Sequence, residues 1–152
     1  MSDDPHPLCQ GHGSDHIAPT FDVPPDTIDS YGHVFGPDDK YSYSPKRCCT
    51  PAEASLKCYL SLHQTLGGID HAVLTQPSIY ETDNSCMFDV VDRMNGKFMA
   101  IVAADADITD KELEALHERQ VRGIRVNLVD KGGMPFAALP RGSSISAGTW
   151  NF

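Results

Sequence analysis

The chain has 152 residues, which is the length of one domain with a substantial core. Its formal charge of -9 argues against nucleic acid or an anionic membrane surface as a partner. No apolar run approaches the roughly 20 residues of a membrane span. Residues 1–19 lack the apolar segment of a secretory signal, so we expect a cytoplasmic protein.

The five cysteines have no spacing typical of a zinc site or a disulfide framework. Their number is odd and they contain no Cys-x-x-Cys pair. In a cytoplasmic protein such cysteines are expected to be reduced. The sequence therefore predicts five free thiols, at Cys9, Cys48, Cys49, Cys58 and Cys86.

The chain begins with a proline-containing arm and a first strand. Residues 1–26 show little apolar periodicity and are predicted to be a disordered arm. A strand is predicted over about residues 27–35. Side chains two positions apart on a strand point the same way. Tyr31 and His33 should therefore face one pocket together.

The next segment carries a helix-start signal. Thr50 is placed as an N-cap, Pro51 occupies the first helical position and Glu53 completes a capping box. Apolar residues then recur at helical spacing until Gly67-Gly68, where we expect the helix to end.

Strands and helices alternate through the rest of residues 27–130. A second capping box at Thr109 and Glu112 predicts the last helix, and Asp83 is a candidate cap of the middle one. This order predicts about four parallel strands joined by right-handed helical crossovers. Residues 131–152 are rich in Gly, Pro, Ser and Ala and are predicted to form an irregular tail. The remaining strands are expected over residues 72–76, 98–103 and 123–129.

Five motifs occur in chain order: Asp29-Ser30-x-x-His33-Val34-Phe35-Gly36-Pro37, Tyr43-Ser44-Pro45, Gln76-Pro77-Ser78, Thr82-Asp83-Asn84 and Val121-Arg122-Gly123-Ile124-Arg125-Val126-Asn127. Together they resemble the amidohydrolase superfamily, in its amidohydrolase-related branch of TIM-barrel metal-dependent hydrolases, and they are similar to the motifs of the pyrone-dicarboxylate lactonases. The resemblance covers roughly residues 27–130. It implies an α/β fold, the N-terminal half of a (β/α)8 barrel, since a closed barrel needs about 250 residues.

The resemblance implies a catalytic role for His33. In the family the first strand ends in His-x-His, which holds a metal or helps to polarise a substrate carbonyl. Here Tyr31 replaces the first histidine. A phenol remains protonated at neutral pH and is a poor zinc ligand, so a divalent metal on His33 is doubtful. The resemblance also implies that some of the lactonases work without a metal, so the expectation is that no cofactor is bound, with zinc as the alternative that the family offers.

The resemblance also assigns substrate contacts to Arg125, Ser78 and Asn127. A guanidinium can fork onto a carboxylate with two parallel hydrogen bonds, which suits Arg125. Cys49 stands where the relatives have a substrate-contacting tyrosine. Simpler readings stay open. Arg125 could pair with Asp29 or Asp105, Ser78 could be a turn residue, and His33 could be an ordinary buried histidine.

Three functions follow as hypotheses. The first is a hydrolase of a lactone or related cyclic carboxylate ester, with a small carboxylate as substrate. The second is a truncated, inactive fragment of such an enzyme, because the later strands that carry the family's general base have no counterpart here. The third is a small α/β anion-binding module. A partial barrel would leave strand edges open for self-association.

Overall fold

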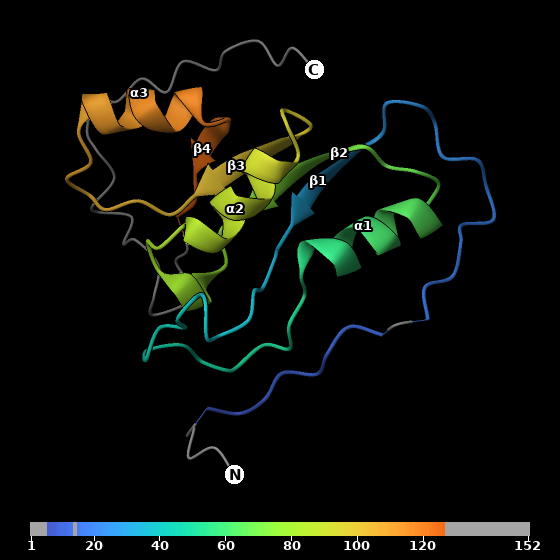
Figure 1. The fold of residues 1–152 in the computed structure, drawn as a ribbon, viewed down its shortest axis with the longest axis horizontal. Helices are drawn as coiled ribbons and strands as arrows, with labels where there is room; N and C mark the ends of the chain where they lie inside the picture. The colour runs from blue at the N-terminus through green and yellow to red at the C-terminus, as the bar shows by residue number, and fades with distance from the viewer. Residues whose placement is uncertain (1–5, 14, 127–152) are drawn as a thin grey trace.

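The computed structural model describes residues 6–13 and 15–126, and its frame is a four-stranded parallel β-sheet (Figure 1). The strands lie side by side in chain order. Residues 131–152, predicted as a tail, lie outside the described part. The strands are β1 (Ile28–Gly32), β2 (His71–Thr75), β3 (Phe98–Val102) and β4 (Val121–Ile124), and the helices are α1 (Leu56–Thr65), the 3-10 helix η1 (Ser78–Tyr80), α2 (Ser85–Arg93) and α3 (Asp110–Glu118).

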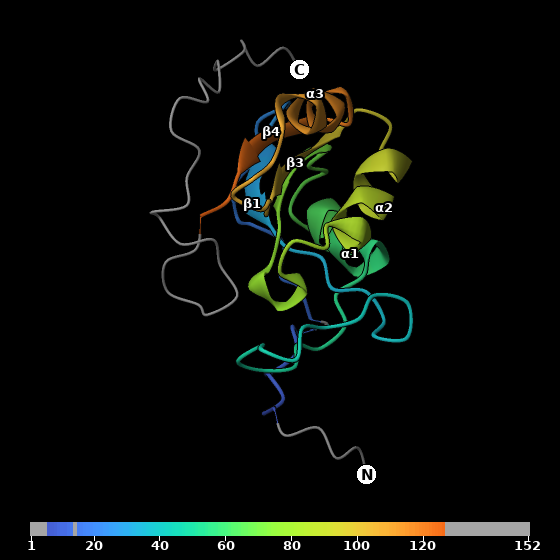
Figure 2. The ribbon, with the colours of Figure 1, turned by 90° about the vertical axis from the view of Figure 1, so that its left-hand side faces the viewer.

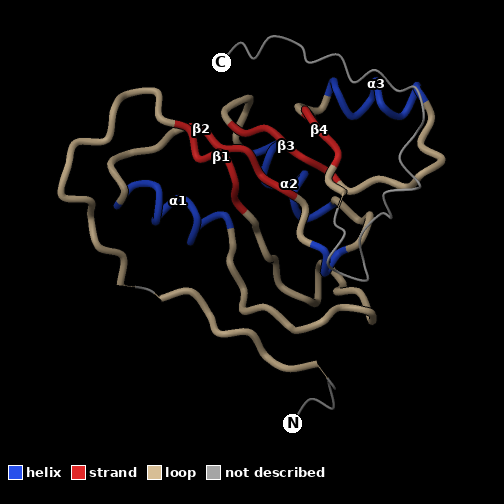
Figure 3. Tube along the Cα trace, turned by 180° about the vertical axis from the view of Figure 1, so that it is seen from behind, coloured by secondary structure: helices blue, strands red, loops and turns tan. Residues whose placement is uncertain are grey.

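The three α-helices lie on the same face of the sheet. Figure 2 shows them on one side of the strands, and the opposite views in Figures 1 and 3 agree. Parallel strands in simple chain order, joined by right-handed crossovers, place every helix on one face. A doubly wound module would have helices on both faces. The described residues therefore form an arc of a TIM barrel, which confirms the predicted fold class.

The core lies between the sheet and α2. Ala72 and Leu74 of β2, with Phe98, Ala100 and Val102 of β3, are all 0% exposed. Alternate residues of each strand belong to this cluster because successive side chains point to opposite faces. The helix α2 covers them with Met87, Val90 and Val91. Burying each large apolar side chain contributes about 1.5–3 kcal/mol, so this layer holds the arc together.

A bulge in β1 decides which polar side chains face the helices. The register with β2 shifts between Asp29 and Gly32, and a Cβ on Gly32 would meet the Tyr59 hydroxyl at 2.2 Å. Both positions therefore face α1. The Asp29 carboxylate accepts hydrogen bonds from Tyr59 Oη at 2.6 Å and from His63 Nε2 at 3.0 Å. Burial alone would raise the pKa of Asp29, but these hydrogen bonds lower it below its ordinary value.

The start of α1 differs from the prediction. The helix begins at Leu56 with Ser55 as N-cap, so the capping box at Thr50 and Glu53 does not form. The Thr50 hydroxyl instead accepts a hydrogen bond from Arg47 Nε at 3.0 Å. The predicted end is correct in kind, since the helix stops at Thr65 and the following Gly67-Gly68 has positive φ angles of 113° and 81°.

The capping box of α3 forms as predicted. Thr109 is the N-cap, its hydroxyl accepts from the Glu112 backbone N–H, and the Glu112 carboxylate accepts from the Thr109 N–H at 2.8 Å. For α2 the N-cap is Asn84, one residue after the predicted Asp83. Asp83 still helps to start this helix, because its Oδ1 accepts from the Ser85 N–H at 3.0 Å. In the described part of the chain, no helix is both long and apolar enough to cross a membrane.

Candidate functional site

A pocket of about 960 Å³ brings together three of the side chains predicted from the sequence. His33, Ser78 and Arg125 all line it. His33 comes directly after β1, Ser78 follows β2 and Arg125 follows β4. The carboxyl ends of parallel strands meet at one edge of a sheet, and this is where TIM-barrel sites lie. The fourth predicted contact, Asn127, lies outside the described residues.

The His33 imidazole has a defined tautomer. Its Nδ1 lies 2.7 Å from the carbonyl oxygen of Thr75. A carbonyl can only accept, so Nδ1 carries the proton and donates it. The neutral ring then presents a lone pair at Nε2. Burial lowers the pKa of His33 below its ordinary value, and although the Thr75 carbonyl opposes this shift, the positive charge of Arg125 adds to it. The neutral form is therefore favoured.

Arg125 is held by two backbone carbonyls, one at the end of β3 and one directly after β2. Its N–H donates to the Val102 carbonyl at 2.7 Å, and its guanidinium Nη1 donates to the Gln76 carbonyl. The alternative pairing with Asp29 is not found, because that carboxylate is bonded to α1. The Gln76 carbonyl is uncharged, so the contact orients the guanidinium without neutralising its charge. This arrangement suits an anionic ligand.

Ser78 opens η1 at the wall of the pocket. It follows Gln76-Pro77, and Gln76 is buried with its side-chain Nε2 donating to the Asp83 carbonyl at 2.7 Å. This bond ties the end of β2 to the segment before α2. Ser78 can therefore be both a turn residue and a substrate contact, since the turn itself brings the residue to the pocket.

The described residues do not fit a metal centre. Tyr31 lies beside His33, with ring centroids 5.0 Å apart, but it is 59% exposed and does not line the pocket. The expectation that both side chains face one pocket is therefore wrong for Tyr31. Within residues 6–13 and 15–126 there is no group of three His, Cys, Asp or Glu side chains that could hold a metal ion. His33, directly after β1, is the imidazole at this end of the strand.

The N-terminal arm supplies pocket residues that sequence reasoning missed. Cys9, Gln10, Gly11 and His12 line the same pocket as His33. No spacing or periodicity indicates them, because residues 6–13 and 15–26 contain no helix or strand. The vicinal cysteines before Thr50 were the available signal, and the disulfide partner of Cys49 lies 40 residues away in the sequence.

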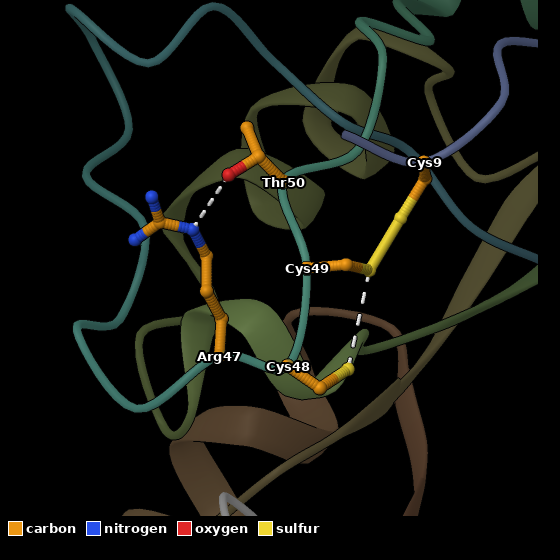
Figure 4. The surroundings of a disulfide bond; sticks show 5 residues. All are labelled: Cys9, Arg47, Cys48, Cys49 and Thr50. Atoms are coloured by element: carbon orange, nitrogen blue, oxygen red, sulfur yellow. Dashed lines mark hydrogen bonds between the residues drawn. A yellow bond between two sulfur atoms is a disulfide. The ribbon is translucent and has the colours of Figure 1, made fainter. Parts of the chain in front are cut away.

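The cysteine prediction is wrong for one pair. Cys9 and Cys49 form a disulfide (Figure 4), whereas Cys48, Cys58 and Cys86 are free. Backbone pairing brings the two together, since the Cys9 N–H donates to the Thr50 carbonyl at 2.8 Å and the Thr50 N–H donates to the Pro7 carbonyl at 2.9 Å. Cys49, at the position of the family's tyrosine, therefore reaches the pocket as half of a disulfide.

Curated relatives are similar over most of this chain. A 4-sulfomuconolactone hydrolase of Hydrogenophaga intermedia is 38% identical over 120 residues, which cover 78% of this chain and 39% of that protein. A 2-pyrone-4,6-dicarboxylate hydrolase of Comamonas testosteroni is 34% identical over 74% of this chain and 37% of its own length. The chain thus spans about two fifths of the curated relatives it matches.

Solved structures match the fold as well. A crystal structure of an Agrobacterium tumefaciens protein has a TM-score of 0.66 at 26% identity and covers 86% of this chain and 44% of its own. A probable 2-pyrone-4,6-dicarboxylic acid hydrolase of Acinetobacter baumannii, with citric acid bound, has a TM-score of 0.60 at 29% identity over 68% of this chain and 38% of its own. The sequence model of the amidohydrolase family matches residues 13–142. The chain therefore belongs to the amidohydrolase family.

Proposed function

We propose that this chain is a hydrolase of a lactone or related cyclic carboxylate ester. The observation that carries the proposal is the convergence of His33, Ser78 and Arg125 on one pocket. Relatives named as hydrolases of a sulfomuconolactone and of a pyrone dicarboxylate support a lactone that bears an acidic group. Because the chain spans about two fifths of those relatives, the activity of the whole protein is part of the proposal.

Arg125 is proposed to bind the acidic group of the substrate. A guanidinium has five N–H donors, and the structure commits Nη1 to the Gln76 carbonyl. Its remaining donors can form a charge-assisted pair with a carboxylate. The Ser78 hydroxyl, on the adjoining wall, is proposed as a second polar contact to the same substrate.

His33 is proposed to act at the reacting ester. The role implied by family resemblance, polarising the carbonyl, requires the imidazolium, which the lowered pKa disfavours. The neutral ring can instead accept a proton at Nε2 from an attacking water. The water oxygen then bonds to the lactone carbonyl carbon and the ring C–O bond breaks. The departing oxygen takes the proton back from Nε2, so the product is an open hydroxy acid. No step requires a metal or other cofactor.

Turnover of 2-pyrone-4,6-dicarboxylate by the purified full chain tests this proposal. Arg125→Gln should raise KM about tenfold or more, as expected for a lost charge-assisted contact. The matched control is Arg122→Gln, since Arg122 bonds to the His117 and Val121 carbonyls and does not line the pocket. Calorimetry with citrate measures binding separately.

The outcomes separate the three hypotheses. Turnover above buffer, weakened by Arg125→Gln and not by Arg122→Gln, supports the hydrolase. Citrate binding that depends on Arg125 without turnover contradicts the hydrolase and favours an anion-binding module. Neither binding nor turnover favours an inactive fragment.

Self-association and a cytoplasmic location are further parts of the proposal. In the sheet of the described residues, β1 and β4 are the outer strands. An unpaired strand edge can accept a second chain, and sizing at several concentrations tests this. The free thiols of Cys48, Cys58 and Cys86 favour the cytoplasm, whereas the Cys9–Cys49 disulfide is unusual there. Cell fractionation tests the location.

A further inference from the structure

A disulfide attaches the arm covalently beside the pocket. The arm, defined here as residues 6–13 and 15–26, buries little apolar surface: Leu8 is 82% exposed, Ile17 87% and Phe21 70%. Hydrophobic burial therefore contributes little to its position. Its contacts beside the pocket include the two backbone hydrogen bonds to Thr50 and the covalent Cys9–Cys49 bond.

A free thiol lies next to this disulfide. Cys48 is exposed, and its Sγ lies 3.9 Å from the Cys49 Sγ. Figure 4 shows the Cys49 sulfur between the sulfurs of Cys48 and Cys9. Displacement at a disulfide sulfur needs an attacking thiolate on one side and a leaving sulfur on the other. The three cysteines are therefore arranged for exchange at Cys49.

We propose that Cys48, Cys49 and Cys9 form a thiol–disulfide relay that determines whether the segment Cys9–His12 closes the pocket. The Cys48 thiolate attacks Cys49 Sγ, so that a Cys48–Cys49 bond forms and the Cys9–Cys49 bond breaks. The electron pair leaves on Cys9 Sγ, which takes up a proton in place of the one Cys48 released. One disulfide exists before and after, so the exchange consumes no oxidant or reductant.

The exchange changes the wall of the pocket. Once Cys9 is released, the hydrogen bonds to Thr50 are no longer supported by a covalent link between two residues 40 positions apart in the sequence, so they break more often. Segments with few buried contacts open locally at low free energy. When these bonds are broken, the Cys9–His12 segment leaves the wall of the pocket that His33 and Arg125 also line, and the pocket opens on that side. This device adds to the proposed hydrolysis and does not depend on turnover.

Differential alkylation of the native full chain tests the relay. N-ethylmaleimide first labels the free thiols, and iodoacetamide labels the remaining cysteines after reduction. Trypsin places Cys48 and Cys49 in one peptide, residues 48–57, which fragmentation between the two residues resolves. The starting state should show the first label on Cys48 and the second on Cys9 and Cys49.

Exchange should move the first label from Cys48 to Cys9. After incubation of the native chain before labelling, a fraction should carry the first label on Cys9 and the second on both Cys48 and Cys49. Cys48→Ser should abolish this pattern. Cys58→Ser is the matched control, because Cys58 is a free thiol on α1 that does not line the pocket. Equal labelling of Cys9 in wild type and Cys48→Ser would overturn the relay, as would no labelling of Cys9 in the wild type.

Hydrogen exchange tests the effect on the arm. Cys9→Ser should speed exchange of the backbone amides at positions 9 and 50 by about tenfold or more, because the arm then opens more often. Cys58→Ser should leave both amides unchanged. Full protection in Cys9→Ser would overturn the proposal that the disulfide holds the arm. These readouts need no substrate, so they remain decisive if the hydrolase proposal fails.

Discussion

His33 and Arg125 are anchored to adjacent carbonyls at the end of β2. His33 Nδ1 donates to the Thr75 carbonyl and Arg125 Nη1 donates to the Gln76 carbonyl. The two side chains come from opposite edges of the described sheet and meet over the strand that follows β1. These two carbonyls set the tautomer of His33 and the orientation of the Arg125 guanidinium. They also place the positive charge of Arg125 beside the neutral imidazole of His33.

The pKa of His33 should lie below its ordinary value of 6.5, because the ring is buried and faces Arg125. Arg125→Gln should raise this pKa, and Arg122→Gln should leave it unchanged. Titration of the histidine ring signals by NMR measures both. A His33 pKa at or above 6.5 would contradict the prediction.

The same shift predicts a pH dependence of stability. A histidine whose pKa is lower in the folded state takes up its proton more readily when unfolded. Its stabilising contribution is complete above about pH 6.5 and is lost as the pH falls toward the folded pKa. Urea unfolding at several pH values in this window should show that the free energy of unfolding rises with pH, and that this rise is smaller in His33→Asn. An equal rise in the variant would show that His33 does not contribute to the pH dependence of stability.

Asp29→Ala should lower the free energy of unfolding by about 1–3 kcal/mol, since it leaves Tyr59 Oη and His63 Nε2 without their acceptor. Asp70→Ala is the matched control. The Asp70 side chain is 72% exposed and pairs with Lys97, so its removal should change stability by less than about 0.5 kcal/mol. Urea denaturation compares them, and equal losses would refute the role assigned to Asp29.

Gly32→Ala should destabilise the fold by about 1–3 kcal/mol through overpacking. The new Cβ would meet Tyr59 Oη at 2.2 Å and displace the ring from Asp29. Gly13→Ala should be nearly neutral, because a Cβ there meets nothing within 4 Å. Thermal unfolding of Gly32→Ala and Gly13→Ala measures the two losses of stability. Tyr59→Phe should cost less in the Gly32→Ala background than in the wild type.

Thr109→Ala should cost about 1 kcal/mol, because it removes the N-cap hydroxyl of α3. Thr109→Ser should retain most of that stability, since the serine hydroxyl can accept from the same Glu112 N–H. The midpoint of denaturant unfolding, at an unchanged m-value, measures the change in stability. Equal midpoints for the alanine and serine variants would show that the hydroxyl is not the stabilising group.

The alternation of strands and helices could be predicted because its signals are local. The Thr109–Glu112 capping box and the glycines after α1 act within one turn of a helix. The failed capping box at Thr50 has the opposite cause. The backbone of Thr50 pairs with the arm, and Ala54 exchanges two backbone hydrogen bonds with Phe35. The backbone of this segment is therefore not available to begin a helix.

The sequence by itself determined the parallel arc and, through family resemblance, named His33, Ser78 and Arg125 as pocket residues. Only the tertiary structure decided that Asp29 faces α1, that Tyr31 stays outside the pocket and that Cys9 reaches Cys49. Helix and strand signals extend over a few residues, whereas a bulge in one strand and the path of an arm depend on packing between distant segments. The periodicity of the sequence does not indicate contacts between distant segments.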